Sequence, residues 1–254
     1  MDLFDAHFHI FEPGFPLVEN QGFLPDPFTL EDYGKWVKKL KIRGGVVVSS
    51  STQVFDTTYL VHALKHLGPY FVGVAQIPET FADEEILALH QHGVRAVRFN
   101  VKRGGSATLD QIELISRRIF DLAGWHVELY VDSKNLPDLI PVLSKLPKVS
   151  IDHLGLSKEG LPALLKLVTQ GVKVKATGFG RLDFDPLEAL QKIHRENPEA
   201  VMFGTDLPST RAKKPFSAKD IELIVQNFSQ EDSKRILWKN GAIFYGVSLD
   251  KSSV

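Results

Sequence analysis

The chain has 254 residues, of which 43% are hydrophobic and 24% charged, and its formal net charge is −1. These values are ordinary for a soluble globular protein and predict a single domain over residues 1–254, a length common among α/β barrels. No run of like charges indicates a nucleic-acid or membrane surface, and no apolar stretch approaches the roughly 20 residues that span a bilayer. The sequence contains no cysteine, which excludes disulfides and thiolate catalysis and fits a cytoplasmic protein.

Strand-like and helix-like segments alternate along the chain. Short apolar runs predict strands at Leu3–His9, Gly45–Ser49, Phe71–Ile77, Ala96–Asn100, His126–Asp132, Val149–His153, Val172–Thr177 and Val201–Asp206. Amphipathic stretches predict helices near Leu30–Lys41, Thr57–His66, Asp83–His92, Leu109–Ala123, Leu136–Lys145, Leu161–Gln170, Pro186–Glu196 and Ala218–Asn227. Eight such units predict an α/β fold closed into one (β/α)8 TIM barrel. A doubly wound open sheet is the alternative, but no glycine-rich phosphate loop follows the first strand.

Two segments lie outside this repeat. Phe11–Phe28 is rich in proline and glycine and too long for a simple turn between a strand and a helix. Long loops in compact domains are usually functional, so we expect this one to lie over the mouth of the barrel. The stretch Glu231–Tyr245 predicts a last helix, which we expect to pack across the barrel exterior.

The first strand carries a candidate site in the motif Asp5-Ala6-His7-Phe8-His9. Side chains alternate across a strand, so Asp5, His7 and His9 share one face. Two imidazoles a few ångströms apart can hold one metal ion or bind one polar group of a substrate. A histidine on an apolar strand is also common in protein cores, so this motif alone does not identify a site. Polar residues at the ends of other strands are needed to support that interpretation.

Other predicted strands also end in polar residues, and in a barrel these ends surround the active site. The residues are Arg98 and Asn100, Glu128, Tyr130 and Asp132, Asp152 and His153, Lys173 and Lys175, and Asp206. Unpaired buried charges are costly, so their concentration at one mouth favours a site over a purely structural role. For Glu128 and Lys175, a buried ion pair inside the barrel is an equally good interpretation.

These motifs together resemble the amidohydrolase superfamily of barrel hydrolases, and within it the group around 2-pyrone-4,6-dicarboxylate lactonase. The resemblance extends over essentially the whole chain. The stretches that carry it are Asp5–His9, Gly22–Phe23, Phe28–Tyr33, Val94–Asn100, Trp125–Tyr130, Ile151–Gly155 and Gly204–Pro208. It implies a lactonase-type hydrolase that opens a cyclic ester of a small carboxylated molecule.

The resemblance also implies roles for matching positions. Asp206 would be the general base that takes a proton from the attacking water, and His7, His9 and His153 would surround the scissile carbonyl. The implied substrate-binding residues are Arg98, Asn100, Tyr130 and Arg103. Two positions depart from the pattern of the group: Glu128 stands where a neutral glutamine is expected, and Ser49-Ser50-Ser51 replaces a stretch containing glutamine.

One divalent ion is the cofactor that these residues predict. Three imidazoles and a carboxylate, from His7, His9, His153 and Asp206, form a plausible mononuclear Zn²⁺ or Mn²⁺ site. The fourth predicted strand carries no lysine that could bridge a second ion. The lactonase group includes members thought to work without metal, so metal-independent catalysis stays open.

Two other functions compete with a lactonase. The same histidines and Asp206 would serve a metal-dependent, non-oxidative decarboxylase of an aromatic or muconate-type acid. A non-catalytic barrel that binds an organic acid or a partner protein is the second alternative, against which the full set of His7, His9, His153 and Asp206 argues. The expected partner is a small carboxylated molecule.

Overall fold

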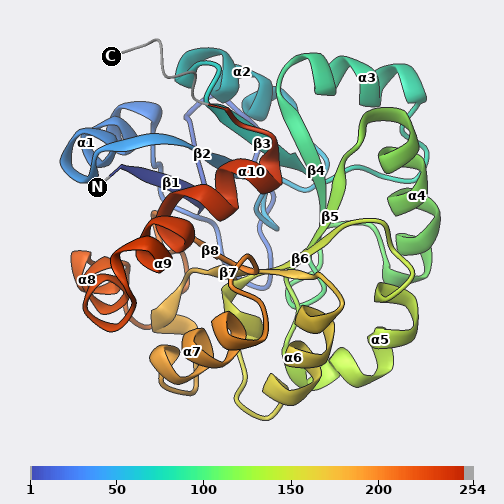
Figure 1. Ribbon diagram of the computed structural model, residues 1–254. Coiled ribbons are helices and arrows are strands. Elements are labelled where there is room, and N and C mark those ends of the chain that lie inside the picture. Colours follow the sequence, from blue (N-terminus) through green and yellow to red (C-terminus); the bar gives the residue numbers. More distant parts are fainter. Residues whose placement is uncertain (1, 249–254) are drawn as a thin grey trace.

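The computed structural model describes residues 2–248, in which parallel strands form a barrel surrounded by helices (Figure 1). The strands pair in sequence order and are β1 (Leu3–Phe8), β2 (Ile42–Val48), β3 (Phe71–Ala75), β4 (Val94–Phe99), β5 (His126–Leu129), β6 (Val149–Ile151), β7 (Lys173–Ala176) and β8 (Val201–Phe203). Asp206 N–H donates to the His7 carbonyl at 2.7 Å, and His9 N–H donates to the Leu207 carbonyl at 2.8 Å. These bonds join β1 to the segment after β8, and the predicted (β/α)8 barrel is confirmed.

One helix follows each strand and covers the outside of the barrel (Figure 1). These helices are α1 (Leu30–Leu40), α2 (Thr58–Leu67), α3 (Asp83–Gln91), α4 (Ile112–Ala123), α5 (Leu136–Leu143), α6 (Leu161–Thr169), α7 (Pro186–Glu196) and α8 (Ala218–Asn227). Helix α1 begins where the sequence predicts, because Thr29 and Asp32 form a reciprocal capping box. None of the helices within residues 2–248 has the length and apolar character that crossing a membrane requires.

The barrel has apolar packing on both sides of the sheet. Between strands and helices, Val97, Val127 and Leu129 share one buried cluster with Ile119 of α4. A second apolar cluster fills part of the interior and consists of Phe4, Ala6, Val46, Val48, Val72, Val74, Ala96, Met202, Ala242, Phe244 and Tyr245. This inner cluster draws on β1 to β4 and β8, so the interior beside β5 to β7 is left for polar side chains.

The C-terminal helical segment closes the floor of the barrel, at the end opposite the mouth. It comprises α9 (Gln230–Lys234), a π-helical turn (Arg235–Lys239) and α10 (Asn240–Tyr245). The Tyr245 ring is buried, and its hydroxyl donates to Glu128 Oε2 inside the barrel at 2.9 Å. This segment was expected to pack across the barrel exterior, but Ala242, Phe244 and Tyr245 of α10 belong to the apolar cluster that fills part of the interior.

The loop Phe11–Phe28 lies over the mouth, as predicted. Phe11 and Phe28 exchange two backbone hydrogen bonds at its base, at 2.9 and 3.1 Å. Val18 N–H donates to the Thr52 carbonyl at 2.7 Å, which connects the loop to the segment after β2.

Candidate active site

Three imidazoles face one carboxylate at the C-terminal end of the barrel. Nε2 of His7 and Nε2 of His9 each lie 3.8 Å from Oδ1 of Asp206. Nε2 of His153 lies 4.0 Å from the same oxygen. All four side chains are buried. The fold thus brings together the four residues that the sequence analysis placed at strand ends up to 199 positions apart.

Backbone and hydroxyl groups hold two of the imidazoles in place. Nδ1 of His9 lies 2.7 Å from the Val48 carbonyl, which can only accept, so Nδ1 carries the hydrogen and Nε2 has a free lone pair. Nδ1 of His153 lies 2.7 Å from Thr177 Oγ1. A Cβ atom at position 178 would come within 2.8 Å of the same Nδ1, so Gly178 makes room for the His153 ring.

The backbone takes up left-handed conformations where the site residues leave their strands. The φ angle of Asp206 is 59°, and a run of four positive φ values, 51°, 49°, 75° and 68°, extends over residues 153–156. Three residues of that run are not glycine, and such conformations cost free energy that surrounding structure must offset. The turn after β6 thereby places His153 at the mouth.

Burial sets the charge of these groups. Desolvation holds the pKa values of His7, His9 and His153 well below the ordinary value for histidine. Burial also raises the pKa of the Asp206 carboxyl, while the guanidinium of Arg181 acts in the opposite direction. Nε of Arg181 donates to Asp206 Oδ2 at 2.7 Å, which leaves Oδ1 facing the imidazoles.

The donor set at this centre fits a divalent cation. Nε2 of His7 and Oδ1 of Asp206 are buried without a hydrogen-bond partner among the described residues. Ligand atoms of His7, His9 and Asp206 all lie within 4.8 Å of one another. Lone pairs that converge without a proton between them repel each other, and a cation removes that repulsion. Imidazole nitrogen and carboxylate oxygen are ligands that Zn²⁺ and Mn²⁺ accept.

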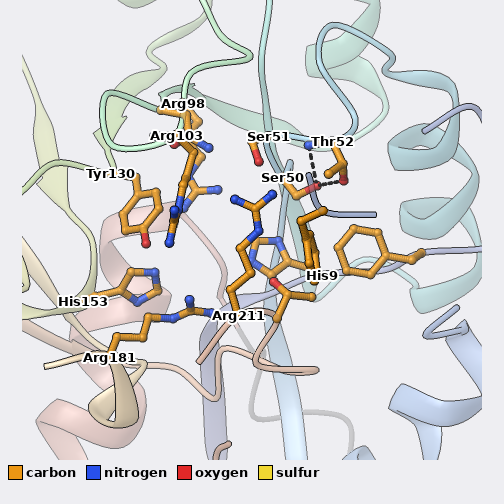
Figure 2. Close-up of a pocket in the computed structure, with 14 residues that line it drawn as sticks. His9, Ser50, Ser51, Thr52, Arg98, Arg103, Tyr130, His153, Arg181 and Arg211 are labelled. Atoms are coloured by element: carbon orange, nitrogen blue, oxygen red, sulfur yellow. Dashed lines mark hydrogen bonds between the residues drawn. The ribbon is translucent and has the colours of Figure 1, made fainter. Parts of the chain in front are cut away.

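A cavity opens above the imidazoles at the mouth of the barrel. Figure 2 shows Arg103, Arg181 and Arg211 extending into it from different loops, with Tyr130 beside His153. The residues that line it are His9, Phe11, Phe23, Ser50, Ser51, Thr52, Arg98, Asn100, Arg103, Tyr130, His153, Arg181, Thr210 and Arg211. The described lining contains four arginines and no carboxylate, so the cavity is suited to an anion.

The four predicted substrate-binding residues all line this cavity, but their surroundings differ. Arg98 is only 3% exposed, and its Nε and Nη2 donate to Asp152 Oδ2 at 3.1 and 2.7 Å. The Arg98 guanidinium also lies 5.1 Å from the centre of the Tyr130 ring. Asn100 Oδ1 accepts from Arg103 N–H at 3.1 Å, so Asn100 shapes the turn that carries Arg103.

Sequence reasoning missed Arg181 and Arg211. Both lie in loops beyond β7 and β8, whereas the predicted site residues lie at the strand ends. The Arg211 guanidinium contacts Asn20 of the mouth loop and stacks on the Phe23 ring at 4.3 Å. Each of these arginines follows the end of a strand within a few residues. Because the loops after the strands form the active site of such a barrel, this position could have identified both of them.

Below the imidazoles lies a network of buried charges. Lys175 Nζ is 2.5 Å from Glu128 Oε2, and both side chains are fully buried, so the interpretation as an ion pair is confirmed. Burial and the neighbouring Asp152 raise the pKa of Glu128, against the opposite effect of Lys175. Lys173, which the sequence analysis grouped with the polar residues of the mouth, lies at the floor of the barrel, 3.9 Å from Glu199.

Sequence comparisons identify relatives over most of the chain. The family model described as amidohydrolase matches residues 4–247. A 2-pyrone-4,6-dicarboxylate hydrolase of Comamonas testosteroni is 31% identical, and the alignment covers 82% of this chain and 77% of that protein. A 4-sulfomuconolactone hydrolase of Rhizobium radiobacter is 26% identical, and the alignment covers 96% of this chain and 89% of that protein.

Solved structures share the fold. A protein of Agrobacterium tumefaciens superposes with a TM-score of 0.86 at 21% identity, covering 98% of this chain and 97% of its own. A probable 2-pyrone-4,6-dicarboxylic acid hydrolase of Acinetobacter baumannii, solved with citric acid bound, superposes with a TM-score of 0.83 at 24% identity. The superposition covers 97% of this chain and 100% of that chain. The family model spans nearly all of the sequence, and this chain therefore belongs to the amidohydrolase family.

Proposed function

We propose that the protein is a hydrolase that opens the ring of a small carboxylated lactone. The observation that carries this proposal is the cluster of Asp206 and three imidazoles, two of which, His9 and His153, line a cavity that is also lined by four arginines. Guanidinium groups pair with carboxylates, often through two parallel hydrogen bonds, so the arginines would orient an anionic ring above the imidazoles. The hydrolases of Comamonas and Rhizobium, whose names specify a pyrone dicarboxylate and a sulfomuconolactone, support the same reaction class.

Asp206 is the general base in this proposal. Arg181 holds its Oδ2, and Oδ1 is free to accept a proton from a water molecule above the imidazoles. The water oxygen bonds to the carbonyl carbon, the ring C–O bond breaks, and the departing alkoxide or enolate oxygen takes up a proton. A positioned general base contributes about 10²–10⁴-fold to such a step.

His7, His9, His153 and Asp206 would hold one divalent ion, Zn²⁺ or Mn²⁺. When bound, the ion would polarise the substrate carbonyl as a Lewis acid. We favour this assignment over metal-free catalysis, because Nε2 of His9 has a lone pair rather than a hydrogen to donate. In a metal-free site, His9 would have to carry its hydrogen on Nε2 in order to donate it to the substrate carbonyl.

The substrate-binding group in this proposal keeps Arg98, Asn100, Arg103 and Tyr130 and adds Arg181 and Arg211. The guanidinium of Arg103 donates only to Gln21 of the mouth loop, at 3.1 Å, among its described contacts. Arg103 and Arg211 are therefore the arginines best placed to exchange loop contacts for a substrate carboxylate. Arg98 already donates to Asp152 and would contact the anion with its remaining N–H groups.

A substrate panel tests the proposal. Purified protein is incubated with pyrone carboxylates, muconolactones, uncharged lactones and aromatic acids, with and without a chelator, while ring opening and CO₂ release are followed. We expect ring opening of carboxylated lactones and little turnover of uncharged ones. CO₂ release from an aromatic or muconate-type acid without ring opening would identify a decarboxylase instead. Binding of these acids without any turnover would identify the non-catalytic alternative.

A further inference from the structure

The buried charges below the imidazoles have no part in the steps proposed above. Lys175 Nζ contacts Glu128 Oε2 at 2.5 Å, and the Tyr245 hydroxyl of α10 donates to the same oxygen at 2.9 Å. Glu128 and Lys175 are fully buried and Tyr245 is 2% exposed. A buried ion pair is rarely more stabilising than well-packed apolar residues of the same volume. Its presence therefore requires another explanation.

The two donors turn the Glu128 carboxylate toward His7. Because both occupy Oε2, the second oxygen, Oε1, lies 3.7 Å from His7 Nδ1. Oδ1 of Asp152 approaches the same nitrogen at 3.4 Å. Both oxygens are buried and have no hydrogen-bond partner among the described residues. Two buried acceptors thus face one ring nitrogen, and a hydrogen on that nitrogen would satisfy one of them.

Lys175 offers the opposite arrangement. Its Nζ lies 3.4 Å from His7 Nδ1 and could donate to it, which would place the imidazole hydrogen on Nε2. That hydrogen would have no acceptor within bonding distance, since Asp206 Oδ1 is 3.8 Å away. Oδ1 of Asp152 and Oε1 of Glu128 would both stay unsatisfied. The arrangement with the hydrogen on Nδ1 leaves fewer buried groups without partners, and such groups are costly.

We infer that Glu128, Lys175 and Tyr245 are positioning residues for His7. Together with Asp152 they keep the imidazole hydrogen on Nδ1 and direct the Nε2 lone pair toward Asp206. The last helix of the chain thereby supports the site from the floor of the barrel. The inference rests on the proposed role of His7 as a metal ligand, whose outward nitrogen must be free of hydrogen.

Nitrogen NMR of the metal-free protein tests the inference directly. Histidines are labelled with ¹⁵N, and the His7 signals are identified by their absence from a His7→Gln variant. We expect a protonated Nδ1 and an unprotonated Nε2 for His7. The reverse pattern would overturn the inference, because Lys175 would then be the donor to Nδ1. This measurement needs neither substrate nor turnover.

Variants separate positioning from packing. Glu128→Gln, whose amide can donate to Nδ1, is expected to give a mixture of the two His7 tautomers. Lys175→Met removes the cation that holds Oε2 and should let the Glu128 carboxylate turn away from His7. Both variants should also weaken Zn²⁺ binding by about 10–100-fold, the effect typical of lost outer-shell partners. Zn²⁺ affinity is measured by competition with a coloured chelator. Tyr245→Phe removes one of two donors to Oε2, so its effect should be smaller. Lys173→Met, the same substitution two residues earlier on β7, should match the unaltered protein.

A double variant covers the case in which single changes prevent folding. Lys175→Met with Glu128→Leu removes both charges at similar volume, a replacement that buried ion pairs often tolerate. We expect near-normal stability and weakened Zn²⁺ binding. Unchanged Zn²⁺ affinity in this variant would refute the positioning role. The substrate panel tests the proposed function separately. If no lactone is opened but NMR shows the expected His7 pattern, the lactonase proposal fails while the positioning role of these residues stands.

Discussion

The interior of the barrel has two halves that are equally buried and chemically opposite. Beside β1 to β3, Phe4, Val46 and Val72 belong to an apolar cluster that packs against the C-terminal helix. Across the barrel, Glu128 of β5 and Lys175 of β7 are fully buried ions. Both halves are built from parallel strands of one sheet, and their chemical difference lies in the side chains that the strands direct inward.

The difference shows which half serves stability. Burying a large apolar side chain stabilises a fold by about 1.5–3 kcal/mol, whereas the desolvation of a buried ion pair can cancel its attraction. The charged half lies directly beneath His7, and Asp152 links it to Arg98 at the edge of the cavity. We therefore expect changes in the charged half to act on activity and changes in the apolar half to act on stability.

The largest expected effect is that of Asp206→Asn. Asparagine keeps the shape of the side chain but cannot take a proton from water, so kcat should fall by about 10²–10⁴-fold while substrate binding largely persists. Steady-state kinetics and a direct binding titration on the same preparation measure both. Asp121→Asn on the exposed face of α4 is the matched control. A near-normal kcat for Asp206→Asn would remove this residue from the mechanism.

Metal removal should have the next largest effect. Lewis-acid assistance is worth several kcal/mol, so treatment with a chelator should lower kcat/KM by on the order of 100-fold. Added Zn²⁺ or Mn²⁺ should restore it, and elemental analysis should find at most one ion per chain. If the chelator changes nothing while His153→Ala still inactivates, the histidines act without metal.

The residues that could be predicted from sequence are those in regular strands. Alternation along a strand placed His7, His9 and Glu128 on the inner face, and the structure has them there. The same rule placed Lys173 and Lys175 on one face of β7, but it did not show that Lys173, the first residue of the strand, lies at the floor, where its side chain reaches Glu199. Inward orientation does not tell how far along the barrel axis a side chain lies.

The loops and the last helix could not be predicted in the same way. Arg181 follows a turn that begins with Gly178 in a left-handed conformation, and no periodic pattern places a side chain after such a turn. Tyr245 belongs to a short helix whose buried side is set by the open floor of the barrel. Its sequence alone is equally compatible with packing on the outside.

Arg98→Lys should have a moderate and selective effect. Lysine keeps the positive charge but loses the planar group that donates twice to Asp152 and faces the cavity. We expect kcat/KM to fall by about 10-fold more for carboxylated lactones than for uncharged ones, as one lost charge-assisted bond implies. Arg117→Lys, on the exposed side of α4, serves as the control. Equal losses for both kinds of substrate would show that Arg98 only supports the network.

The smallest expected effect belongs to the apolar half, in Phe4→Leu. The Phe4 ring is 1% exposed and packs against Trp238 and Tyr245, with centroid separations of 5.9 and 6.2 Å. Leucine leaves some of this space empty, so the free energy of unfolding should fall by about 1 kcal/mol, measured by urea denaturation. Because Phe4 touches none of the charged groups around His7, kcat and Zn²⁺ affinity should stay unchanged. A loss of either in a fully folded Phe4→Leu protein would mean that the two halves are coupled through α10, whose Tyr245 contacts both Phe4 and Glu128.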